Sequence, residues 1–320
     1  MKRLVLFLLL ILISNQSFSW GFFAHRRINR LAVFTLPPEM LPFYKKHIHF
    51  ITENSTNPDM RRYAVPEEAA RHYIDLDVYG DSAVYTMPRY WNKAVEQYTE
   101  DTLQAYGIIP WHIMTMKNYL TAAFRKKDLE SILRLSADIG HYIADANVPL
   151  HTTENYNGQL TGQRGIHGFW ESRLPELYSD EFDFFVGQAD YIERPQMKAW
   201  EAVTNAHVCV DSVLTFEKNL SQEFPSDKKY SFEEKGNSTA RVYSRKYSGT
   251  YFKSLDGQIE RRMTASIKMV GDFWFTCWVD AGQPDLSTLL QINLSERERK
   301  KLEEEKKQWE KRTVKSREHN

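Results

Sequence analysis

The chain has 320 residues, of which 42% are hydrophobic and 13% aromatic, so it can bury a substantial core. Lysine plus arginine and aspartate plus glutamate number 42 each, and this balance excludes the basic footprint of a dedicated nucleic-acid binder. The composition therefore favours a globular protein whose function must be sought in its motifs.

The N-terminal residues have the pattern of a secretory signal peptide. Two basic residues precede an apolar run from Leu4 to about Ile13, which is too short to span a bilayer, and small or polar residues continue to Ser19. We expect residues 1–19 to be removed and the mature chain to begin at Trp20. We also expect a soluble protein that is secreted or periplasmic.

Helical periodicity dominates the remaining chain, and alternating strand patterns are scarce. The spacing of apolar residues predicts helices over residues 22–36, 109–125, 129–146, 197–220 and 259–279. Two segments, residues 75–90 and 225–257, are rich in turn-forming and polar residues and predict long loops, the second with short strands.

The C-terminal residues are almost purely charged. From Ser295 onward the charges alternate in sign at helical spacing, which favours a solvated terminal helix over a partner-binding helix. We therefore expect an all-α fold, with one mainly helical domain over residues 20–285 and a charged helix or tail over residues 286–320.

The stretch HYIADANVPLHTTENYNGQLTGQRGIHGFWE, residues 141–171, contains ligand-type residues at helical spacing. His141 and Asp145 are four residues apart, as are His167 and Glu171, and such pairs share one helix face. NVPLH ends the first helix and brings in His151 from the next turn. Zinc binds imidazole and carboxylate where cysteine is absent. Either pair alone is usually an ion pair or a capped polar face, but three histidines in this pattern favour a metal site.

Two further signals are weaker when taken alone. Asp59 and His72 lie thirteen residues apart, one before a predicted helix and one near its end. His25 follows Trp20 by five residues, at the predicted start of the mature chain.

Taken in order, these residues resemble those of the zinc-dependent phospholipase C superfamily, which includes the single-strand-specific zinc nucleases of fungi and plants. The resemblance runs from WGFFAH through HYIADANVPLH to HGFWE, and fades within RRMTASIKMVGDFWFTCW. It covers most of residues 20–285 and does not extend to the charged tail. It implies a mainly helical domain with long loops around a cleft that holds three zinc ions.

The resemblance also implies a ligand set for each ion. The first ion would be held by Asp59, His72 and His141, with Asp145 bridging it to another ion. The second, more separate ion would be held by His151, His167 and Glu171. The third would be held by the terminal amino group and carbonyl oxygen of Trp20, by His25 and by the bridging Asp145.

The activity implied by the resemblance is zinc-dependent hydrolysis of a phosphodiester. A hydroxide held by zinc would attack phosphorus in line, with Asp145 bridging two ions and Asp59 orienting the water. The substrate would be a phospholipid or a single-stranded nucleic acid. A phospholipid substrate allows transient contact with a membrane surface, and no obligate protein partner is implied.

The substrate signals point in two directions. Tyr73 and Asp75 follow His72 as in the nuclease branch, where such residues stack on and hydrogen-bond a base, although Tyr73 also fits core packing. Glu171 and the short interval before His167 are similar to the bacterial phospholipase branch. The choline pocket of that branch has an aromatic residue where this chain has Met60, so the chain departs from the branch at this position.

We expect a phospholipase C-like hydrolase, with a single-strand-specific zinc endonuclease or 3'-nucleotidase as the alternative. A non-catalytic, zinc-stabilised binding protein is an alternative of a different class. The two cysteines, Cys209 and Cys277, fit either one disulfide or two thiols. The remaining histidines are expected to make surface or core hydrogen bonds; they are His47, His49, His112, His207 and His319.

Overall fold

The computed structural model describes residues 21–235 and 238–314. Helices account for 67% of the structure and strands for 3%, which confirms the expected mostly helical fold. The predicted signal peptide, Trp20 and His319 lie outside the described residues.

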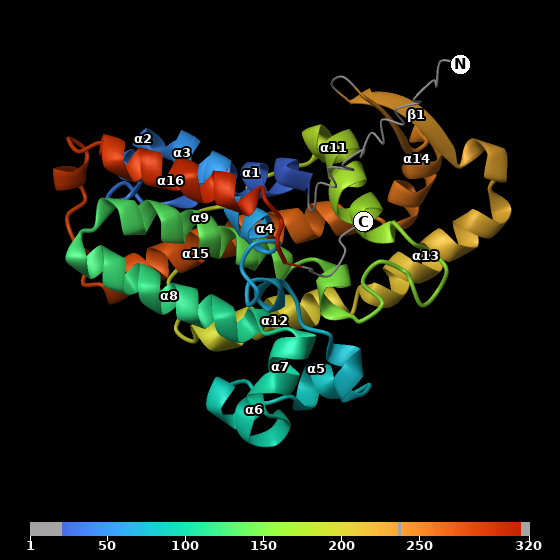
Figure 1. Cartoon of the computed structure of the whole chain (residues 1–320), viewed down its shortest axis with the longest axis horizontal. Helices are drawn as coiled ribbons and strands as arrows, with labels where there is room; N and C mark the ends of the chain where they lie inside the picture. Colours follow the sequence, from blue (N-terminus) through green and yellow to red (C-terminus); the bar gives the residue numbers. More distant parts are fainter. Residues whose placement is uncertain (1–20, 236–237, 315–320) are drawn as a thin grey trace, which may run out of the picture.

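The structure consists of long helices joined by short helical segments and one hairpin (Figure 1). The longest helices are α1 (Gly21–Ala32), α8 (Ile109–Lys126), α9 (Leu129–Asp145), α12 (Pro195–His207), α13 (Val210–Glu223), α14 (Arg245–Ser254), α15 (Gln258–Asp280) and α16 (Glu296–Trp309). The shorter α-helices are α2 (Leu41–Lys46), α3 (Ile48–Asn54), α4 (Asn57–Arg61), α5 (Ala83–Thr86), α6 (Trp91–Tyr98), α7 (Glu100–Tyr106), α10 (Ile166–Gly168) and α11 (Leu174–Tyr178).

Single turns of 3-10 helix and one π-helical turn complete the helical segments. The 3-10 turns are η1 (Val33–Thr35), η2 (Ala69–His72), η3 (Leu76–Tyr79), η4 (Pro149–Thr152), η6 (Ser179–Glu181), η7 (Ser226–Lys228) and η8 (Ser287–Leu289), and the π-helical turn is η5 (Phe169–Arg173). The hairpin pairs β1 (Tyr230–Lys235) with β2 (Ser238–Tyr243) in antiparallel register, with Tyr230 opposite Tyr243.

The core forms where α15 packs against α1, α8 and α9. Buried apolar residues recur every four positions at the start of α15, and every residue from Met269 to Trp274 is buried, so this part of the helix is enclosed on all sides. Trp274 is fully buried; its ring stacks on that of Tyr44 with 4.8 Å between centroids, and its indole N–H donates to the carbonyl of Ser136. This packing fixes α9, the helix that carries two of the predicted ligands.

Helix α1 crosses α9 at a glycine. A Cβ atom at Gly140 would lie 2.1 Å from the side-chain oxygen of Asn29, so only glycine permits this approach. The side chain of Asn29 also donates a hydrogen bond to the carbonyl of Ala137 at 3.0 Å. The crossing lies next to His141 and holds α1, with His25, against the part of α9 that carries predicted ligands.

Helices α8 and α9 form an antiparallel pair, because the chain reverses within two residues. Lys127 adopts the left-handed conformation (φ 51°), and the Asp128 side chain caps α9 by accepting from the amide of Ser131. Helix α9 then ends at Asp145, and Pro149 begins η4, as NVPLH predicts.

Several segments differ from the sequence predictions. The helix expected over residues 197–220 is two helices, α12 and α13, with a turn at Val208 and Cys209. His207 is the last residue of α12, and its Nδ1 lies 3.1 Å from both the hydroxyl and the carbonyl oxygen of Thr152. The end of α12 is therefore held against η4. The loop expected over residues 225–257 contains the hairpin and also α14, which the Ser244 side chain caps.

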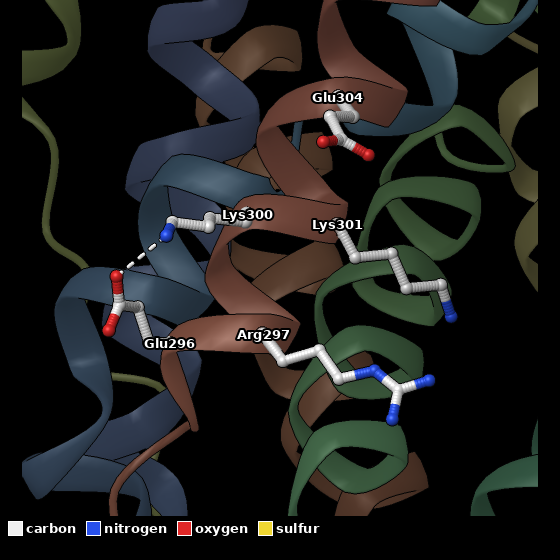
Figure 2. Close-up of a pocket in the computed structure, with 5 residues that line it drawn as sticks. All are labelled: Glu296, Arg297, Lys300, Lys301 and Glu304. Carbon is white, nitrogen blue, oxygen red and sulfur yellow. Dashed lines mark ion pairs between the residues drawn. The ribbon is translucent and has the colours of Figure 1, made fainter.

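The charged C-terminal segment forms α16, which begins with a capping box between Ser295 and Glu298. The helix lies beside α9 in Figure 1, and Arg134 of α9 pairs with Glu305 at 2.6 Å. Figure 2 shows a pocket over its outer face, where Lys300 pairs with Glu296. Most of these side chains are exposed, so this pocket is a solvated charged surface.

Within the described residues, the structure contains neither a helix able to span a membrane nor a disulfide. Within residues 21–235 and 238–314, no helix has the length and apolarity needed to cross a bilayer. Cys209 and Cys277 are both free thiols, so the disulfide alternative is wrong.

Candidate metal centre

Helix α9 presents His141 and Asp145 one turn apart toward the interior, and both side chains are almost fully buried. The two groups meet, with His141 Nε2 3.2 Å from Asp145 Oδ2. Their neighbours on the helix are apolar and fill the core, so the packing of α9 aims both polar side chains at one point.

A first group of ligand-type atoms forms around His141. Asp59 lies in α4 and His72 ends η2, and Asp59 Oδ1 is 3.7 Å from His141 Nε2 and 3.8 Å from His72 Nδ1. The two imidazole nitrogens, His141 Nε2 and His72 Nδ1, are 3.1 Å apart. These three side chains therefore converge on one small volume that could hold a metal ion.

A second group forms where α1 meets α9. His25 stacks on His141 with 3.9 Å between ring centroids, and its Nε2 is 3.4 Å from Asp145 Oδ1. The other oxygen of Asp145, Oδ2, lies 2.8 Å from His72 Nδ1. The two oxygens of this carboxylate therefore face imidazoles from different groups.

The third group, His151, His167 and Glu171, comes from the chain after α9. His167 Nε2 is 2.9 Å from Glu171 Oε2, and His151 Nε2 is 3.3 Å from the same oxygen. Glu171 lies in η5, the π-helical turn, a feature frequent at functional sites. Like the other two groups, this one is buried and could hold an ion.

Backbone carbonyls and one carboxylate set the orientation of the imidazoles. The Nδ1 atoms of His141, His151 and His167 bond to the carbonyls of Ser55, His72 and Tyr156, at 2.8, 2.5 and 3.1 Å. His72 is reversed: its Nε2 faces Glu68 at 3.7 Å, and Nδ1 faces the site. Such outer contacts fix which nitrogen is available to a metal.

The electrostatics of the site favour an ionised carboxylate at its centre. Burial raises the pKa of Asp145, but the imidazoles of His141 and His151 lower it more, and the result is a pKa well below the usual range. Burial likewise lowers the pKa of His141, but the carboxylates of Asp145 and Asp59 raise it to about 9. The ionised form of Asp145 is the form that could bind a cation.

The structure adds two residues that the sequence analysis missed. Glu68 is buried against His72, and Arg62 is buried with Nη1 3.6 Å from Asp59 Oδ1. A glutamate four residues before a histidine and an arginine three residues after an aspartate are helical spacings that could have indicated both. Each is common on ordinary helices, so neither stands out without the fold.

The predicted substrate residues are buried. Tyr73 is 9% exposed and donates its hydroxyl to the carbonyl of Ala105, and Asp75 is 5% exposed. Their role in substrate binding stays a prediction. Trp20, the predicted terminal ligand, lies outside the described residues, so the structure places only His25 and Asp145 of that set.

Four described histidines remain: His47, His49, His112 and His207. His47 and His112 are buried, and burial lowers their pKa values to about 4 and about 3. His207 bonds to Thr152, and His49 is exposed. None of these four belongs to the three ligand groups.

Comparisons with models of protein families and with curated proteins find no match for this chain. The buried groups of histidine, aspartate and glutamate could hold metal ions, and their donor chemistry carries the functional interpretation.

Proposed function

We propose that the protein is a zinc-dependent phosphodiester hydrolase of the phospholipase C type. The observation that carries this proposal is the position of Asp145, whose two oxygens face His25 on one side and His72 on the other. A carboxylate placed in this way can be shared by two cations. Sites with two metals close together are typical of enzymes that act on phosphate esters.

The donor set supports zinc as the metal. The three groups supply only imidazole nitrogens and carboxylate oxygens, and zinc accepts both. The outer contacts of the four oriented histidines leave one nitrogen of each facing its group. When bound, zinc lowers the pKa of water from 15.7 to about 7 and polarises the phosphoryl oxygens.

Three side chains, Asp145, Asp59 and Arg62, would each have a separate role in the reaction. Asp145 would hold two ions together, and Asp59 would accept a hydrogen bond from the attacking water and orient it toward phosphorus. The guanidinium of Arg62 lies beside Asp59 and has no hydrogen-bond partner within the described part of the chain. Its positive charge would favour an anionic phosphate in the adjacent site.

A phospholipid is the preferred substrate for two reasons. The net charge is zero, so the chain lacks the excess positive charge that draws a protein to nucleic acid. Tyr73, the residue that would stack on a base, is almost fully buried and hydrogen-bonded within the fold. Both observations favour the phospholipase alternative over the nuclease alternative.

The decisive experiment offers zinc-loaded mature protein several substrates in parallel: phosphatidylcholine vesicles, single-stranded DNA and RNA, and an aryl phosphodiester. We expect release of diacylglycerol and cleavage of the aryl ester. The Asp145→Asn variant, purified in the same way, controls for contaminating hydrolases. Cleavage of nucleic acid alone would favour the nuclease, and a zinc-loaded protein without turnover would favour the binding protein.

A further inference from the structure

The end of α16 covers the segment that lies between Asp59 and His72. The guanidinium of Arg61 lies over the ring of Trp309 at 5.5 Å, and that of Arg312 lies over the ring of Tyr63 at 5.0 Å. The amide of Val314 donates to the carbonyl of Tyr63 at 2.8 Å. Three contacts thus join the C-terminal segment to residues directly after a predicted ligand.

Arg61, which contacts α16 through Trp309, also contacts residues deeper in the fold. Its Nη2 atom lies 2.9 Å from Asp138 Oδ2 of α9, 3.2 Å from the hydroxyl of Tyr142, and 3.4 Å from Glu68 Oε1. The hydroxyl of Tyr142 donates a short hydrogen bond to Glu68. Arg61 therefore connects α16 to both the helix of His141 and the carboxylate beside His72.

Glu68 is the last member of this chain of contacts. It is 1% exposed, and its Oε1 faces His72 Nε2 at 3.7 Å, while its Oε2 accepts from Arg71 at 2.7 Å. At 3.7 Å the two atoms are too far apart for a direct hydrogen bond, so Glu68 acts on the Nε2–H side of His72 through its negative charge. Loss of an outer carboxylate behind a ligand histidine typically lowers metal affinity about 10–100-fold. The position of Glu68 is therefore a determinant of how His72 presents Nδ1.

We propose that Trp309 and Arg61 are positioning residues of the metal centre, and that α16 acts on His72 through Glu68. The inference rests on the proposed metal centre. Trp309 is 7% exposed, and its ring covers the guanidinium of Arg61. A cation over an aromatic face is held by the ring quadrupole, so the ring limits where Arg61 can lie. Arg61 in turn limits where Glu68 can lie.

The test compares substitutions of Trp309 that separate the aromatic face from apolar bulk. Trp309→Leu keeps an apolar side chain under α16 but removes the ring, whereas Trp309→Phe retains a ring face. Glu305→Gln is the matched control, because it removes the pairing of α16 with Arg134 of α9 and leaves Arg61 unchanged. For each variant, zinc affinity is measured by competition with a chromophoric chelator, together with the absorption spectrum of the cobalt-substituted protein and the melting temperature in excess chelator.

We expect Trp309→Leu to bind one zinc ion roughly 10-fold more weakly and to alter the cobalt spectrum, as outer contacts of metal ligands do. Trp309→Phe should keep most of the wild-type zinc affinity. Glu305→Gln should match the wild type in both zinc affinity and cobalt spectrum. If Trp309→Leu lowers only the melting temperature in chelator and keeps wild-type metal affinity and spectrum, Trp309 merely anchors the helix and the inference is overturned.

Glu68→Gln provides a second measurement that does not depend on how α16 docks. It should weaken zinc binding about 10–100-fold and alter the cobalt spectrum in the same direction as Trp309→Leu. Unchanged affinity in Glu68→Gln would overturn the inference even if Trp309→Leu failed to fold. A wild-type protein that binds neither zinc nor cobalt would overturn the proposed function as well, so the two failures are distinguishable.

Discussion

Asp145 is the residue on which the proposed chemistry depends most. It is 1% exposed, and its carboxylate has imidazoles on both sides, at 3.4 Å from Oδ1 and 2.8 Å from Oδ2. Burying an ionised carboxylate is costly unless cations or hydrogen bonds compensate for the lost solvent. Its surroundings lower its pKa, so the site is arranged to keep the negative charge that two cations would share.

We predict that Asp145→Asn loses metal at two positions, whereas Glu171→Gln loses metal mainly at one. An amide has no net charge to share between two cations, and the expected fall in turnover exceeds about 100-fold, because even outer contacts of metal ligands are worth 10–100-fold. Elemental analysis of gently purified variants measures the zinc content. Equal losses of one ion from both variants would contradict the shared role of Asp145.

At the level of helices, the crossing of α1 and α9 decides whether His25 reaches the site. The backbone of Gly140 lies against the side chain of Asn29, one residue before His141. The 3.9 Å stacking of His25 on His141 depends on the same approach. The glycine is therefore tied to the candidate metal centre through helix packing, although it offers no ligand atom.

Gly140→Ala is expected to push α1 away from α9. The new methyl group would meet Asn29 at 2.1 Å, and overpacking of this kind costs about 1–3 kcal/mol. We predict a lower melting temperature and weaker binding of the ion held by His25, both measurable on zinc-titrated protein. Gly249→Ala in α14 is the control, because the nearest atom there is the Tyr178 hydroxyl at 3.2 Å. If both variants bind zinc like the wild type, the crossing does not position His25.

The sequence predicts local helical geometry better than contacts between distant segments. The four-residue spacing of His141 and Asp145 predicts that they share a face, because that depends only on helix geometry. The grouping of Asp59 with His72 and His141 rested instead on a family resemblance, because no local pattern joins residues so far apart. The contact of Trp309 with Arg61 could not be predicted, since α16 reads as a solvated charged helix.

For the molecule as a whole, the three groups tie distant parts of the chain together. The side chains of the candidate metal centre come from α1, α4, η2, α9, η4, α10 and η5, so its candidate ligands span residues 25 to 171. An ion that holds such ligands together binds the folded state and not the unfolded chain. Metal binding should therefore stabilise the whole fold as well as supply chemistry.

We predict close to three zinc ions per chain by elemental analysis, and a large fall in thermal stability when a strong chelator removes them. At a free zinc concentration 1,000 times the dissociation constant, each site stabilises the fold by about 4 kcal/mol. For a domain of this size, the contribution of each site corresponds to a shift in melting temperature on the order of 10 °C. Returning zinc in slight excess should restore the original melting temperature, and Glu171→Gln should show a smaller chelator effect than the wild type. A chelated, zinc-free protein that melts at the wild-type temperature would show that the buried carboxylates and imidazoles compensate one another without an ion, and the metal centre would have to be abandoned.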